Sequence, residues 1–98
     1  MSESDIERKV VAFCKRNGVY TRKFVSPAHK GVPDRIVIGP KGALFVEFKA
    51  PGRKPTKLQL REMSIINSIA NMGVSAAWCD SYGSALVLIR EVCMCKST

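Results

Sequence analysis

The strongest constraint on the fold is a pair of apolar segments, 35–38 and 43–49, that flank the turn Gly39-Pro40-Lys41-Gly42. Both segments are rich in branched and aromatic residues, so they predict two antiparallel strands joined as a hairpin. Each also carries charge where its neighbours predict burial, since Asp34 precedes the first and Glu47 lies within the second. An unpaired buried charge costs several kcal/mol, so another group must offset it.

Side-chain alternation places these charges together. Glu47 and Lys49 point to one face of their strand, and the hairpin brings Asp34 close to the same end. Two carboxylates beside an ammonium form a natural site for a hard divalent cation. The alternative is that Glu47 and Lys49 form cross-strand ion pairs with Arg35 or Arg22, worth under ~1 kcal/mol when exposed.

The metal interpretation predicts hydrolysis of a phosphodiester. Asp34, Glu47 and the backbone carbonyl of Phe48 would hold Mg²⁺ or Mn²⁺, which would polarise the scissile phosphate and lower the pKa of a water. Lys49 would orient that water or help to deprotonate it, and would stabilise the developing negative charge. No small-molecule cofactor is expected.

A third carboxylate, Glu7, falls on the apolar face of a helix predicted to begin within 4–7 and to end at Asn17-Gly18. There it would hold a metal-bound water or ligate a second ion. The alternative is structural, because Ser4-x-x-Glu7 fits a capping box worth ~1 kcal/mol.

The rest of the chain predicts a single α/β domain over residues 1–98, with a sheet flanked by helices in the order α-β-β-β-α-β-α. The remaining predicted elements are a strand over 19–25, a helix capped by Thr56 and running to about Met72, a strand over 74–79 and a helix from Asp80-Ser81 to about Met94.

Charge and composition bear on partners and on location. The formal net charge of +8 favours a polyanionic partner, of which nucleic acid is the commonest, although many small proteins are basic only for solubility. The polar, acidic N-terminus lacks a signal peptide, and no apolar run is long enough to cross a bilayer, so a cytoplasmic location is expected. The four cysteines, Cys14, Cys79, Cys93 and Cys95, lack zinc-site spacing and are expected to act as small apolar residues.

Two basic loops flank the predicted metal site. Lys30 precedes Asp34, whereas Arg53, Lys54 and Lys57 follow Lys49. Phosphate contacts are expected from both loops, with ordinary solvated charge as the alternative for each residue. His29 in the first loop would be a phosphate contact, a proton shuttle or a bystander.

Pro33-Asp34 followed by Glu47-x-Lys49 resembles the signature of the PD-(D/E)xK nucleases. The chain resembles the VRR-NUC branch of that superfamily from about Asp5 to Asp80, most closely over 23–27, 31–35, 46–52 and 57–59. The resemblance implies a restriction-endonuclease-like mixed sheet and metal-dependent cleavage of structured DNA, including branched DNA of the Holliday-junction type. Phe48 departs from the aliphatic residue that is commoner in the family; this would change packing and leave the carbonyl ligand intact.

The resemblance also implies a site role for Gln59, in orienting Lys49 or the water, although Thr56-x-x-Gln59 fits a capping box as well. Short members of the family are expected to act as dimers. An apolar stripe at Ile65, Ile69 and Met72 fits a homodimer contact, unless the last helix covers it. The rival to a nuclease is a basic nucleic-acid-binding module without catalysis.

Overall fold

A computed structural model describes residues 1–71 and 73–94 and confirms the predicted order of elements. The elements are α1 (Glu3–Arg16), β1 (Tyr20–Lys23), β2 (Arg35–Ile38), β3 (Ala43–Phe48), α2 (Lys57–Ile69), β4 (Val74–Cys79) and α3 (Tyr82–Val92).

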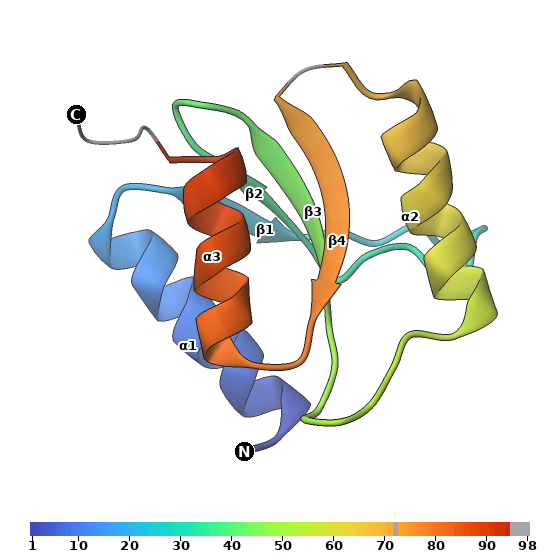
Figure 1. Cartoon of the computed structure of the whole chain (residues 1–98), viewed down its shortest axis with the longest axis horizontal. Helices are drawn as coiled ribbons and strands as arrows, with labels where there is room; N and C mark the ends of the chain where they lie inside the picture. The colour runs from blue at the N-terminus through green and yellow to red at the C-terminus, as the bar shows by residue number, and fades with distance from the viewer. Residues whose placement is uncertain (72, 95–98) are drawn as a thin grey trace.

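The four strands form one mixed sheet in the order β1-β2-β3-β4. The first three strands pair antiparallel, whereas β4 runs parallel to β3. A parallel pair needs a crossover connection, and α2 provides it. In Figure 1, α1 and α3 lie side by side over one face of the sheet, whereas α2 stands apart beside β4.

Alternation along β3 decides which face is the core. Leu44, Val46 and Phe48 are fully buried or nearly so, and they pack with Ile6 of α1 and Ile89 of α3. The large Phe48 ring is thus accommodated in the core, so the departure from the family pattern has a packing explanation. The other face of β3 carries Phe45 and Glu47 toward the α2 side, and Glu47 is the buried charged residue among those described.

The start of α1 differs from the sequence prediction. Ser2 is the N-cap, and its hydroxyl accepts a hydrogen bond from Asp5 while the Asp5 side chain bonds the Ser2 backbone. The capping box predicted for Ser4 and Glu7 is therefore wrong, because the helix begins one residue earlier and Ser2 already satisfies its free amides. Glu7 is left free to make other contacts.

Other boundaries shift by a few residues. The strand predicted over 19–25 spans only 20–23, and the strand predicted to 49 ends at Phe48. Helix α2 ends at Ile69 rather than near Met72, which lies outside the described residues. Helix α3 ends at Val92 rather than near Met94.

A close backbone approach locks the hairpin against the rest of the sheet. A Cβ atom at Gly42 would lie 2.1 Å from the carbonyl oxygen of Gly73 and 2.8 Å from that of Val92. Only glycine leaves room for this contact. The turn between β2 and β3 is thereby fixed to the start of β4 and the end of α3.

The cysteines within the described residues behave as predicted. Cys14, Cys79 and Cys93 are buried free thiols, and burial raises the pKa of Cys79 to about 12. Cys95 lies outside the described residues. Among the helices described, none is long and apolar enough to cross a membrane.

Candidate active site

Strand pairing brings Asp34 and Glu47 to the same end of the same face. The register pairs Arg35 with Val46, so one further step places Asp34 opposite Glu47. The Phe24 amide donates to the Asp34 carbonyl at 2.9 Å, which continues the ladder onto the β1 side. Side chains directly opposite on antiparallel strands share a face. The two carboxylates therefore face the α2 side of the sheet together.

Asp34 is held by the backbone of the neighbouring strand. Its Oδ2 accepts a hydrogen bond of 2.8 Å from the Phe48 amide, so the aspartate is tied to the strand that carries Glu47. The Phe48 carbonyl belongs to the same residue, and its role as the third ligand stays a prediction. This bond fixes the spacing between the two acidic side chains.

Glu47 is a buried carboxylate with an incomplete set of partners in the described part of the chain. Its side chain is only 2% exposed. Its Oε2 accepts a hydrogen bond of 2.9 Å from Gln59 and lies 3.5 Å from the Lys49 ammonium. Its Oε1 is buried and has no partner among the residues that the structure describes. A buried carboxylate oxygen without a donor is costly unless a cation completes it.

The electrostatics agree with this cost. Burial raises the pKa of Glu47 to about 7, and the nearby charge of Asp34 adds to the rise while Lys49 opposes it. Burial also raises the pKa of Asp34, the amide of Phe48 lowers it, and Glu7 raises it. Both acids therefore have a raised pKa, and the ionised form of each is short of compensating positive charge.

Gln59 forms the predicted capping box and also donates to Glu47, whereas its predicted role in orienting Lys49 or the water stays a prediction. The side-chain Oε1 of Gln59 accepts a hydrogen bond of 2.9 Å from the backbone amide of Thr56. The backbone amide of Gln59 donates to the Thr56 hydroxyl, so the capping box is complete. Because the bond from Thr56 identifies Oε1 as the acceptor of the Gln59 side chain, the NH₂ group is the end that donates to Glu47. The helix cap thus orients a donor into the site.

Glu7 lies near the site but is engaged elsewhere. Its Oε2 accepts a hydrogen bond of 2.7 Å from Arg35 Nε and lies 3.2 Å from Lys23 Nζ. Lys23 and Arg35 are cross-strand partners, and like charges in such a pair repel. Glu7 bridges and neutralises them. Its charge still raises the pKa of Asp34. The structure thus gives Glu7 two cations as neighbours, and its predicted contact with a metal-bound water or a second ion stays a prediction.

The predicted ion pairs of Glu47 with Arg35 or Arg22 do not form. Arg35 binds Glu7 instead, and Arg22 stacks on the Tyr20 ring at 4.4 Å. Within the described ranges, the cation paired with Glu47 is Lys49. The two arginines have other partners, and the charges that favour the ionised form of Asp34 are those of Lys23 and Lys49.

The basic loop that follows Lys49 borders the site, whereas the described contacts do not link the loop before Asp34 to it. Arg53 and Lys54 line a polar pocket of about 380 Å³ with Lys49, Ala50 and Glu3. Lys57 is the first residue of α2 and is exposed. Lys30 and His29 are exposed in the loop before β2, where the His29 ring lies 3.4 Å from the Ser26 hydroxyl.

The donor set fits a hard divalent ion with few protein ligands. Among the described residues, no three His, Cys, Asp or Glu side chains gather as a ready ligand cluster. The predicted set needs only Asp34, Glu47 and a backbone carbonyl, and Mg²⁺ commonly binds through one or two carboxylates with water. The unpartnered Oε1 of Glu47 and the mutual repulsion of the two acids are what such an ion would relieve.

Sequence patterns did not indicate the contacts of four residues near the site. Arg35 and Lys23 were not assigned to Glu7, although their cross-strand pairing could have suggested a shared anion. Asp80 accepts a bond of 3.2 Å from the Gly52 amide and ties down the basic loop. Glu3 lines the polar pocket and its charge raises the pKa of Glu47, which spacing alone did not indicate.

Comparisons with known proteins agree with this geometry. No family model matches the chain. A solved structure described as a VRR_NUC domain superposes with a TM-score of 0.75 at 28% identity, covering 90% of this chain and 94% of that one. The protein named "Putative nuclease p44" of Acyrthosiphon pisum secondary endosymbiont phage 1 is 52% identical over 61 residues. That alignment takes in 61% of this chain and 66% of the phage protein, just under two thirds of its length.

Proposed function

We propose that this chain, which belongs to the VRR-NUC family, is an endonuclease that hydrolyses phosphodiester bonds of DNA with the help of Mg²⁺ or Mn²⁺. The observation that carries the proposal is the pair of opposed carboxylates, half-buried Asp34 and buried Glu47, in which Oε1 of Glu47 has no partner among the described residues. The phage relative is itself named a nuclease.

Asp34, Glu47 and the backbone carbonyl of Phe48 would hold the ion. When bound, it supplies a Lewis acid that polarises the scissile phosphate and makes a water more acidic. Gln59 keeps Oε2 of Glu47 occupied, so that Oε1 remains the oxygen free for ligation. The Phe48 amide restrains Asp34 in the same way through Oδ2.

Lys49 provides the fixed positive charge. Its ammonium lies 3.5 Å from Glu47, and its side chain is only 15% exposed. A partly desolvated ammonium stabilises negative charge that develops on the phosphate and orients the attacking water. Glu7 would affect the site indirectly, because it pairs with Lys23 and Arg35, which lie beside Asp34.

The substrate we propose is structured DNA, including branched duplexes. Arg53 and Lys54 share a pocket with Lys49 and would receive phosphates next to the scissile bond. Lys30 and Lys57 are exposed and would contact the backbone further away. Phosphate contacts of this kind select shape rather than sequence.

We propose further that the working form is a homodimer. Ile65 is 41% and Ile69 is 75% exposed on α2. Helix α3 packs with α1 on the opposite face of the sheet and does not cover them (Figure 1). A two-fold pair of sites suits the cleavage of both strands of a branched substrate.

The cytoplasm of a bacterial or phage-infected cell suits such an enzyme. Three free thiols, those of Cys14, Cys79 and Cys93, support a reducing compartment.

The test is cleavage of branched and linear duplex DNA in Mg²⁺, Mn²⁺ or EDTA. The wild-type protein should cut in either metal and stop in EDTA. Asp34→Ala and Glu47→Ala should still bind DNA and lose more than about 100-fold in cleavage rate, since loss of even an outer-shell partner of a metal ligand costs about 10–100-fold. The exposed acid Glu91 supplies the matched control, Glu91→Ala, which should cut normally.

Unchanged cleavage in the two site variants, or cleavage that persists in EDTA, would contradict the metal mechanism. Binding without cleavage by the wild-type protein under every metal condition would favour the non-catalytic binding module instead.

A further inference from the structure

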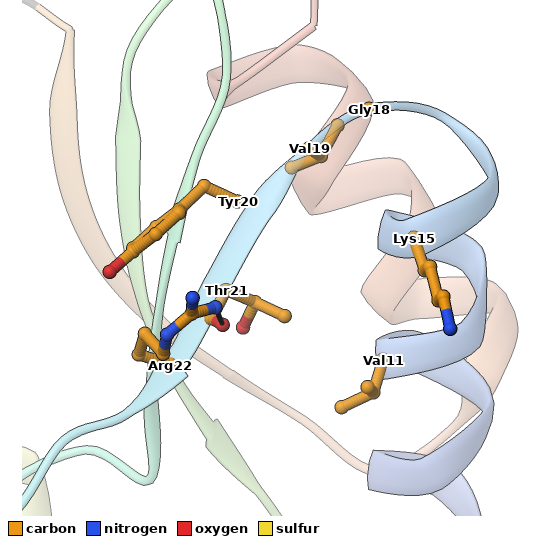
Figure 2. A pocket seen from close by; sticks show the side chains of 7 residues that line it. All are labelled: Val11, Lys15, Gly18, Val19, Tyr20, Thr21 and Arg22. Carbon is orange, nitrogen blue, oxygen red and sulfur yellow. Dashed lines mark hydrogen bonds between the residues drawn. The ribbon is translucent and has the colours of Figure 1, made fainter.

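A groove between α1 and the edge strand β1 has no part in the proposed catalysis. One part of it, of about 430 Å³, is bordered by α1 and β1, as Figure 2 shows. A second part, of about 360 Å³, continues toward the N-terminal end of α1. Val11 lines both parts, so they are adjacent segments of one groove.

The α1 side of the groove is a single helical stripe. Ser4, Arg8, Val11 and Lys15 lie at spacings of four, three and four residues, which places them along one face of the helix. In Figure 2, Val11 extends from α1 toward β1 and Thr21 lies across from it, whereas the Lys15 side chain runs along α1 and Tyr20 and Arg22 stack on the far side of the strand.

The charge of the groove is strongly positive. Apart from Arg22, which stacks on Tyr20 on the far side of β1, four cations and one carboxylate line its two parts, and the carboxylate, Glu7, is already paired with Lys23 and Arg35. Arg8 pairs with Asp5, but both side chains are exposed. A pair of that kind is worth under about 1 kcal/mol and is readily exchanged for a phosphate.

The groove also leads to the candidate active site. Its inner end is lined by Glu7, Lys23 and Arg35; Arg35 directly follows Asp34 in the chain, and Lys23 is the cross-strand partner of Arg35. The basic loop of Arg53 and Lys54 lines a separate pocket with Lys49. Positive charge thus reaches the site along a path distinct from that loop.

We propose that this groove binds the sugar–phosphate backbone of one strand of the DNA substrate, with Arg8 and Lys15 as phosphate contacts and Val11 against the sugar. The inference rests on the proposed function, and it adds a second track that leads the strand to the site. From Ser4 to Lys15, α1 rises about 16 Å at 1.5 Å per residue. That length matches about five nucleotides of one strand at 3.4 Å each.

The test compares two double variants with the same charge and spacing. Arg8→Gln/Lys15→Gln removes two cations from the groove stripe. Lys9→Gln/Arg16→Gln removes two cations, also seven residues apart, from another face of the same helix. Affinity for a labelled 30-base-pair duplex is measured in EDTA by fluorescence anisotropy over a range of KCl concentrations.

The groove variant should bind at least about tenfold more weakly at 100 mM salt, and its plot of log affinity against log salt should be shallower by about 2, one unit per lost contact. The control should keep nearly the wild-type slope. Equal changes in the two variants, or none in either, would overturn the groove proposal and leave an acidic protein segment as the better ligand for this surface.

The cleavage assay separates this proposal from the proposed function. If the wild-type protein binds DNA through the groove but never cuts with Mg²⁺ or Mn²⁺, the nuclease proposal fails and the groove survives. If it cuts but the two variants are alike, only the groove fails. If the wild-type protein binds no DNA, both fail.

Discussion

Replacing Glu47 with glutamine should stabilise the metal-free protein at alkaline pH, although it removes a proposed catalytic ligand. The carboxylate is 2% exposed, and its pKa is raised from 4.5 to about 7 by burial and by Asp34. Each unit of such a shift corresponds to about 1.4 kcal/mol, so the ionised form costs the fold about 3 kcal/mol above pH 7. Glutamine carries no charge and keeps the shape of the side chain.

The direction of the pH dependence follows from the raised pKa. The folded state binds this proton more tightly than the unfolded chain, so the contribution of Glu47 favours folding most below about pH 4.5. Stability is then lost as the pH rises toward 7 and is constant above it. The pKa of about 7 already includes the opposing attraction of Lys49 at 3.5 Å, so the net gain of Glu47→Gln at pH 8 should be about 3 kcal/mol. In a domain of this size, that gain raises Tm by roughly 15 °C.

The assay is urea unfolding in EDTA from pH 4.5 to 8, followed by the fluorescence of the single tryptophan, Trp78, which pairs with Glu47 across β3 and β4. The difference in unfolding free energy between Glu47→Gln and the wild type should grow across this range. Glu91→Gln, at an exposed glutamate, should show no such trend. A Glu47→Gln protein that is less stable than the wild type at pH 8, by the same amount as at pH 5, would refute the reasoning.

Three further perturbations test separate parts of the structure. Gln59→Glu places a carboxylate against Glu47, so cleavage measured by kcat should fall at least about tenfold, while Gln59→Ala should lose less; equal losses would argue against a charge effect. Glu7→Gln leaves the like charges of Lys23 and Arg35 facing each other, so the unfolding free energy should fall by about 2 kcal/mol. The affinity for Mn²⁺, measured by calorimetry, should stay nearly unchanged, and a large loss of affinity would favour Glu7 as a metal ligand. Gly42→Ala forces a Cβ into the Gly73 carbonyl and should cost about 3 kcal/mol in urea unfolding; a neutral result would mean that the hairpin is not locked there.

Local chemistry was enough to predict the strands that carry the acids. The alternation of apolar residues around Glu47 and the turn at 39–42 fix both the hairpin and the face of each side chain. For the same reason, the sequence predicts Asp34 close to the end of the strand that carries Glu47. The parallel pairing of β3 with β4 gives no periodic signal of its own, and a mixed sheet is implied only by the family resemblance.

Long side chains were less predictable than backbone register. Spacing placed Glu7 on the inner face of α1, but its partner was decided by which cations could reach it across the sheet. The helix cap was misplaced because Ser2 and Ser4 each precede a suitable acid by three residues, and only the observed helix start distinguishes them. The sequence predicts Gln59 as either a helix cap or a site residue. It does not show that the two ends of one side-chain amide can contact Thr56 and Glu47 at the same time.

The most direct measurement is the anomalous scattering of Mn²⁺ in crystals grown with the ion. A peak within about 2–2.3 Å of an oxygen of Asp34 and of Oε1 of Glu47 is the expected result, and it should vanish in Glu47→Gln. A peak bound only at other acids, or none at an ion concentration that supports cleavage, would contradict the shared ion.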